Sequence, residues 1–206
     1  GTRLARSRYN ERMSGSDHVK PAPAAMKLTY DDLLTLYGED GKRHELIDGE
    51  HHVTPTPSVR HQTIVGALHL LIANFLEEHR IGRVILSPMD VIFSDVDVVE
   101  PDLLYVSQAR AEALTHLHVR GVPDLVVEVA SRSTRRRDET TKRKLYERVG
   151  VLEYWIVDPE IDVVRVYRQE ASGFGRPVEF SREAGDIVTT PLLPGLELPL
   201  ARVFRD

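Results

Sequence analysis

The chain has 206 residues, of which 41% are hydrophobic and 29% are charged, and this length is sufficient for one domain with a substantial core. Its formal net charge of −5 argues against a simple polybasic binder of nucleic acid or membranes. The absence of cysteine excludes disulfides, thiolate zinc sites and cysteine nucleophiles. No apolar stretch approaches the roughly 18 residues of a membrane helix, so we expect a soluble, cytoplasmic protein.

Residues 1–26 carry five basic side chains and a Pro/Ala-rich linker without apolar periodicity, which predicts a flexible tail before a single domain over residues 27–206. Thr29 and Asp32 have the spacing of a capping box, so a short helix is expected to begin there. Asp48-Gly49 predicts the turn of a hairpin over residues 44–53. Apolar residues at helical spacing then predict a long helix over residues 61–79, ending near Gly82.

Short β-rich runs separated by Pro, Gly and Asp dominate the rest of the chain. They cover residues 84–86, 91–93, 103–106, 125–130, 154–157 and 163–167. A helix over residues 134–149, closed by Gly150, separates the fourth run from the fifth. This order predicts an α/β (α+β) fold in which helices pack on the faces of a mixed sheet.

Two carboxylates stand at the ends of predicted strands. Glu128 interrupts an apolar strand and alternates with Val126 and Ala130, so it either points into a covering layer or reaches solvent at the strand end. If buried, it needs a cation, a proton or a metal. Asp102 opens another strand, where turn chemistry is its ordinary role. On adjacent strand ends, however, the two carboxylates would form an oxygen site suited to Mg²⁺ or Mn²⁺.

Two further side chains could join this site. Lys142 lies one helical turn before Leu145 and Tyr146, so it either snorkels to solvent or aims its ammonium group at the strand of Glu128. Glu45 alternates with Ile47 on the first hairpin strand. It either shares an inward face with Ile47 or is an exposed strand glutamate.

Together, these residues resemble the catalytic set of the PD-(D/E)XK nuclease superfamily, and the chain more closely resembles the Uma-type family of bacterial restriction endonucleases within it. The matching stretches are residues 28–34, 44–50, 57–61, 88–91, 101–106, 123–129, 142–146 and 153–159. The resemblance implies a restriction-endonuclease-like core, with a central mixed sheet flanked by helices. It also implies metal-dependent hydrolysis of DNA, with Mg²⁺ or Mn²⁺ held by Asp102 and Glu128 and with the Val129 carbonyl as a further candidate ligand.

The resemblance also gives roles to the remaining groups. Lys142 would orient or polarise the attacking water and stabilise the transition state, and Glu45 would assist the metal or the water. Ala130 stands where the superfamily motif places its lysine, so the lysine must come from the following helix. Lys142 occupies the position that the Uma-type family uses, and Lys144 is the fallback.

A basic segment indicates where DNA would bind. Residues 132–148 contain eight basic and three acidic side chains, a local charge of +5 that leaves −10 for the remainder. We predict DNA contacts from Arg135, Arg136 and Arg143 in this segment and from His61 at the start of the long helix. A solvated basic face is the alternative for the segment, and a core or capping role is the alternative for His61.

Two other functions remain open at this point. The first is a catalytically silent domain of the same fold that binds nucleic acid or protein. The second is a glycosidase that uses Glu45 and Glu128 as its carboxylate pair, which would need neither a metal nor Lys142. For a nuclease, we expect a homodimer, because two sites related by a two-fold axis cut two strands most simply.

Overall fold

A mixed β-sheet forms the centre of the computed structural model, which describes residues 26–37 and 40–205. The predicted tail, apart from Met26, lies outside the described residues. The sheet consists, in spatial order, of β11 (Gly173–Phe174), β10 (Val163–Glu170), β9 (Glu153–Asp158), β8 (Leu125–Val129), β6 (Leu103–Ser107) and β3 (Gly82–Leu86), with β12 (Val178–Ser181) also paired to β10. β8 and β9 are parallel, whereas the other neighbours are antiparallel. The predicted α/β class with a mixed sheet is confirmed.

A second sheet lies beside the first. It consists of β2 (Glu50–Thr54), β1 (Arg43–Ile47), β5 (Asp97–Val99), β4 (Val91–Ser94) and β7 (Val119–Arg120), and the strands β13 (Ile187–Val188) and β14 (Leu198–Pro199) form a separate pair. Asp48 and Gly49 turn the predicted hairpin with φ values of 53° and 75°, as a type I′ turn requires. Nothing in the sequence indicated this second sheet, because β5, which joins the hairpin to β4, is too short to give a periodic signal.

The helices begin close to where the sequence places them. α1 (Tyr30–Tyr37) starts with the predicted capping box, in which the Thr29 N–H donates to Asp32 Oδ2 at 2.9 Å and the Asp32 N–H donates to Thr29 Oγ1 at 3.3 Å. α2 (Val59–His79) ends at Arg80, which adopts the left-handed conformation. The remaining short helices are η1 (Gln108–Ala113), of 3₁₀ type, and α5 (Leu200–Val203).

The third predicted helix, over residues 134–149, has an irregular turn at its centre. It comprises α3 (Arg135–Arg137), a π-helical turn η2 (Asp138–Lys142) and α4 (Arg143–Val149). Gly150 caps it with a φ of 86°, as predicted. Turns of π type are rare and often occur at functional sites. This one lies in the crossover between the parallel strands β8 and β9.

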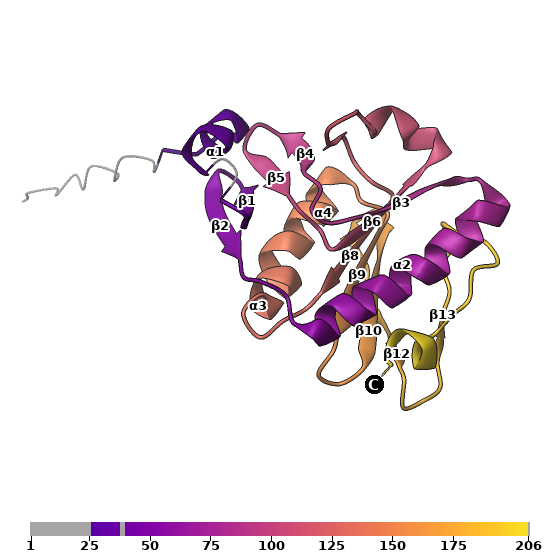
Figure 1. Cartoon of the computed structure of the whole chain (residues 1–206). Coiled ribbons are helices and arrows are strands. Elements are labelled where there is room, and N and C mark those ends of the chain that lie inside the picture. Colours follow the sequence, from indigo (N-terminus) through magenta and orange to yellow (C-terminus); the bar gives the residue numbers. More distant parts are fainter. Residues whose placement is uncertain (1–25, 38–39, 206) are drawn as a thin grey trace, which may run out of the picture.

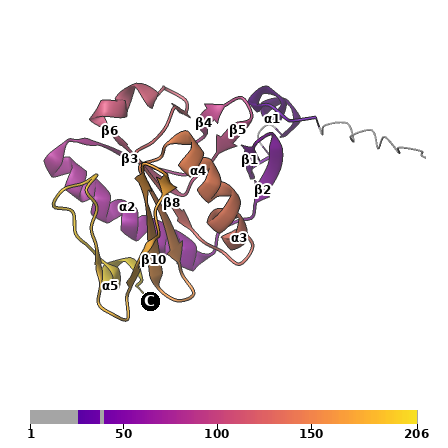
Figure 2. The ribbon, with the colours of Figure 1, turned by 180° about the vertical axis from the view of Figure 1, so that it is seen from behind.

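Helices cover both faces of the larger sheet. α2 crosses one face in Figure 1, and the view from behind in Figure 2 shows α4 on the other. In β8, Leu125, Val127 and Val129 belong to the core under α2, whereas Val126 belongs to the core under α4. Side chains alternate along a strand, so Glu128 faces α4. Within the described residues, none of the helices combines the length and apolar character needed to cross a membrane.

The start of α2 offers a test of the fold. Ser58 caps this helix, and its Oγ accepts a hydrogen bond from the His61 N–H at 3.2 Å. We expect Ser58→Ala to lower the free energy of unfolding by about 1 kcal/mol, measured by urea denaturation. Gln62→Ala, at an exposed position of the same turn, should change it by less than about 0.5 kcal/mol. Equal losses in the two variants would contradict the capping role.

Candidate active site

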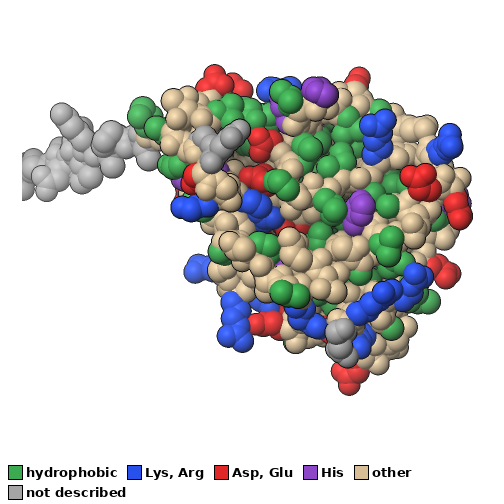
Figure 3. Space-filling model, in the orientation of Figure 1, with side chains coloured by type: hydrophobic (Ala, Val, Ile, Leu, Met, Phe, Trp, Pro, Cys, Tyr) green, Lys and Arg blue, Asp and Glu red, His purple; other side chains and the backbone are tan. Residues whose placement is uncertain are grey.

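A pocket of about 480 Å³ opens where the hairpin, the start of α2 and the π-helical turn meet the ends of β6 and β8. Asp102, Glu128, Lys142 and His61 all line it. In Figure 3, several Lys and Arg side chains lie at the lower left, over the region of α3. The chain therefore brings three of the four predicted catalytic residues and one predicted DNA contact to one cavity.

Asp102 is held at the start of β6 by three donors. Arg43 Nη1 donates to its Oδ1 at 2.7 Å, while its Oδ2 accepts from the Val129 N–H at 2.8 Å and lies 3.0 Å from His61 Nε2. Burial would raise the pKa of this carboxyl, but His61 and Arg43 outweigh it and lower the pKa to about 2. Asp102 is thus a charged carboxylate inside the protein.

Glu128 lies opposite Asp102, because the β6–β8 register pairs Leu103 with Val127, one step away. Its Oε1 accepts hydrogen bonds from Lys142 Nζ at 2.9 Å and from the Tyr146 hydroxyl at 2.7 Å. Burial, reinforced by the charge of Asp102 and opposed by Lys142, raises the pKa of Glu128 to about 8. The ionised form of Glu128 therefore needs additional positive charge.

Lys142 is clamped between two carboxylates. Its Nζ lies 2.7 Å from Glu45 Oε1 and 2.9 Å from Glu128 Oε1, and its side chain is 1% exposed. Burial would lower the pKa of Lys142, but Glu128 and Glu45 raise it above its usual value, so the ammonium group stays charged. Snorkelling is therefore excluded for Lys142, whereas Lys144 is exposed.

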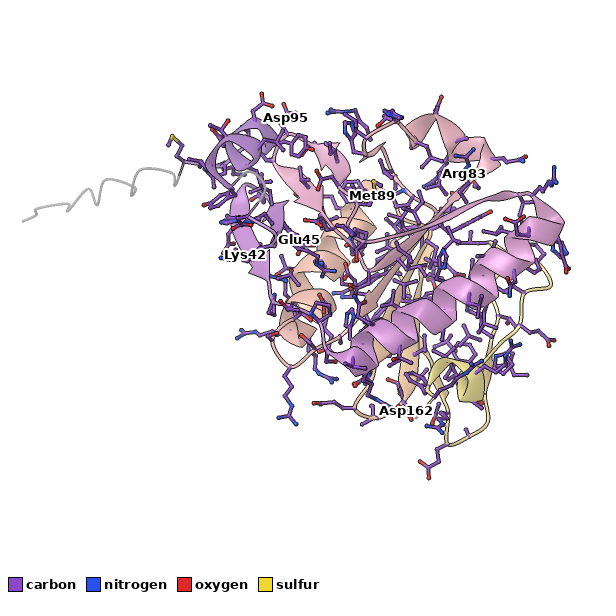
Figure 4. All side chains as sticks on the ribbon, viewed as in Figure 1. Lys42, Glu45, Arg83, Met89, Asp95 and Asp162 are labelled. Atoms are coloured by element: carbon purple, nitrogen blue, oxygen red, sulfur yellow. The ribbon has the colours of Figure 1, made fainter. Side chains whose placement is uncertain are left out.

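Glu45 faces inward from β1, as Figure 4 shows. It is fully buried, which excludes the alternative of an exposed strand glutamate. Its Oε1 accepts from the Glu100 N–H at 3.0 Å and its Oε2 from Thr54 Oγ1 at 3.4 Å. Burial would raise the pKa of Glu45, but Lys142 outweighs it and lowers the pKa. Glu45 is not among the residues that line the pocket, and it contacts the same ammonium group as Glu128. The two carboxylates therefore do not flank an open site as the pair of a glycosidase does.

The carboxylates fit a hard divalent cation. Within the described ranges, no group of three or more His, Cys, Asp or Glu side chains is arranged to hold a metal ion. Mg²⁺, however, is commonly bound by one or two carboxylates, with waters and substrate phosphates completing its shell. Asp102 and Glu128 line the pocket and could supply those two carboxylates. The raised pKa of Glu128 fits the same conclusion, since a cation would favour its ionised form.

The predicted DNA-contacting arginines are placed differently from His61. Arg135 binds Asp158 through both terminal nitrogens and lies 3.2 Å from Glu160. The guanidinium group of Arg143 packs over the ring of Tyr167, with 5.8 Å to the ring centroid. Arg136 is exposed and lies outside the pocket lining. The structure thus engages Arg135 and Arg143 within the protein, and DNA contact by these arginines stays a prediction.

Several residues of the site were missed in the sequence. Arg43 could have been found, because it precedes Glu45 by two residues and so shares its strand face. Tyr146 lies four residues after Lys142, a spacing that brings helical side chains together. Arg137 and Asp138 also line the pocket, but they had no such signal, because the π-helical turn changes their direction relative to Lys142.

The comparisons with known proteins bear on the family and the fold. A family profile described as "Uma2: Putative restriction endonuclease" matches residues 30–201. Among solved structures, the chain is similar to a crystal structure from Anabaena variabilis described as a putative nuclease belonging to DUF820. The TM-score is 0.72 at 23% sequence identity, with 86% of this chain and 97% of that chain covered. The comparison with curated proteins finds no match. The profile spans most of the sequence, and the chain therefore belongs to the Uma2 family.

Proposed function

We propose that the protein is a metal-dependent endonuclease that hydrolyses phosphodiester bonds of DNA. The observation that carries this proposal is the meeting of Asp102, Glu128 and Lys142 in one pocket, with the Lys142 ammonium group fixed 2.9 Å from Glu128. Two carboxylates that can hold a metal and a fixed cation that can stabilise transition-state charge are groups that suit phosphodiester hydrolysis. Membership of a family described as restriction endonucleases supports the same reaction.

Each residue of the site would have its own role in the hydrolysis. Asp102 and Glu128 would hold Mg²⁺ or Mn²⁺, which when bound activates water and neutralises phosphate charge. Lys142 is already protonated and cannot accept a proton from water, so it would stabilise the negative charge that develops on the phosphorane-like transition state. Glu45 would position Lys142 through their 2.7 Å contact. His61 and Arg43 would orient Asp102.

A cleavage assay on plasmid and single-stranded DNA, with Mg²⁺, Mn²⁺ or a chelator, tests the proposal. We expect cleavage with metal and none in chelator, and a loss of at least about 100-fold in Glu128→Gln and Asp102→Asn. Both substitutions preserve side-chain shape while removing the charge needed to hold the metal. Glu77→Gln, on the exposed surface of α2, is the matched control and should cleave like the wild type.

The outcomes separate the alternatives. Cleavage that persists undiminished in Glu128→Gln would reject the proposed site. If the wild type cleaves no DNA and Asp102 and Glu128 bind no divalent ion in calorimetry with DNA present, the silent-domain function is correct. On supercoiled plasmid, conversion directly to linear product would support the proposed homodimer, whereas accumulation of nicked circles would indicate single active sites acting separately.

A further inference from the structure

Unpartnered buried nitrogens surround the pocket. Among the described residues, five buried polar side-chain atoms have no hydrogen-bond partner. Three of them, Arg43 Nε, His61 Nδ1 and Arg137 Nε, belong to residues that line this one pocket. Buried polar groups without a partner are rare in folded proteins because they are costly. The two guanidinium nitrogens can only donate, whereas His61 Nδ1 accepts when Nε2 donates to Asp102. The arginine pair therefore indicates a ligand that brings hydrogen-bond acceptors.

The two arginines lie on connected parts of the pocket wall. The register of β1 and β2 pairs Arg43 with Thr54, so both side chains lie on the same face of the hairpin. Arg137 reaches the same point from α3, where its Nη2 donates to Thr54 Oγ1 at 3.0 Å. On its other side, Arg43 contacts Asp102. Two guanidinium groups therefore flank Thr54 next to the candidate metal ligands.

We propose that Arg43 and Arg137 form a clamp for one phosphate of the nucleic-acid substrate, beside Asp102 and Glu128. This inference rests on the proposed nuclease function and assigns the substrate-binding groups of the same site. A guanidinium group suits this task because its planar fork of N–H donors matches two phosphate oxygens. Phosphate contacts carry no sequence information, so the clamp would accept any DNA sequence and selectivity would arise elsewhere.

The test measures binding rather than cleavage. A fluorescent single-stranded oligonucleotide is titrated with the full chain in Ca²⁺, its integrity is checked on a gel, and the anisotropy is followed at several salt concentrations. We expect Arg137→Gln to weaken binding about 10-fold or more and to reduce the slope of log K against log salt by about 0.7, the value for one lost contact to a single strand. Arg137→Lys should keep the slope and lose affinity, because it retains the charge without the fork.

Arg83→Gln is the matched control, because Arg83 is exposed on β3, away from Glu45 and the hairpin in Figure 4. Thermal melts confirm that each variant is folded, and Arg43→Lys offers a second probe that retains charge beside Asp102. The clamp would be overturned if Arg137→Gln and Arg43→Lys both had the same affinity and the same salt slope as Arg83→Gln. If cleavage depends on Glu128 in that case, the nuclease function stands without the clamp. If the clamp variants weaken binding but no DNA is cut, the clamp stands and the nuclease function fails.

Discussion

Replacement of Lys142 by methionine is expected to lower the free energy of unfolding by about 3–5 kcal/mol. The ammonium group lies 2.7 Å from Glu45 Oε1 and 2.9 Å from Glu128 Oε1, and all three side chains are buried. Methionine keeps much of the volume of lysine but leaves two carboxylates facing each other without a cation. The same variant should lose DNA cleavage, because the fixed positive charge at the pocket is gone.

Lys144→Met is the matched control, since Lys144 lies on the exposed surface of the same helix. Its free energy of unfolding should change by less than about 0.5 kcal/mol. In urea denaturation, the double variant Glu45→Gln/Lys142→Met should lose less free energy of unfolding than the two single variants lose together, because Glu45→Gln removes one of the two carboxylates left without a cation. If Lys142→Met were as stable as Lys144→Met, the contacts of the ammonium group with Glu45 and Glu128 would contribute nothing to the free energy of unfolding.

The sequence could predict the part of the site that depends on strand periodicity. Glu128 stands in an apolar run, and alternation put it on the face of Val126, where it would either enter a covering layer or reach solvent; it is buried on the side of α4. The spacing of Lys142 from Leu145 and Tyr146 likewise placed the lysine on the inward side of its helix. Both inferences needed only local geometry, and both agree with the structure.

Contacts between distant segments could not be predicted in this way. Arg43 and His61 meet Asp102 from 59 and 41 residues away, and nothing in the local pattern marks either as its partner. The second sheet depends on β5, a strand of three residues. The π-helical turn over Asp138–Lys142 has no sequence signal in a regular helical pattern, yet it decides which side chains of this helix face the pocket.

The roles of the arginines in the basic segment, residues 132–148, also could not be predicted from the sequence. Eight basic residues between positions 132 and 148 suggested a surface for DNA, but composition cannot tell which arginines are used within the fold. Arg135 is bound by Asp158, and Arg143 packs over Tyr167. The arginines that line the pocket include Arg43 and Arg137, and neither stood out in the sequence.

Arg135→Met should therefore act on stability rather than on DNA binding. Asp158 is fully buried, and Arg135 Nη2 donates to its Oδ1 at 2.8 Å. Loss of the guanidinium group leaves a buried carboxylate short of its main partner, at a cost of about 3 kcal/mol at pH 7. Arg136→Met removes an equal charge from the exposed neighbouring position and should change the free energy of unfolding by less than about 0.5 kcal/mol.

The pH dependence of this loss identifies its cause. Burial would raise the pKa of Asp158, but the hydrogen bond from Arg135 and the Glu160 N–H outweigh it and hold the pKa below its usual 3.8. The pair therefore stabilises the fold above about pH 4, and this contribution is lost as the pH falls through the lowered native pKa. In Arg135→Met, the pKa of Asp158 should be higher than in the wild type, because the hydrogen bond and charge of Arg135 are lost while the Glu160 N–H and Arg165 remain. The difference from the wild type, followed by urea denaturation between pH 3 and pH 8, should then be largest near neutrality and shrink in acid. If Arg135→Met is as stable as the wild type across this range and binds DNA more weakly, Arg135 contacts the nucleic acid rather than Asp158.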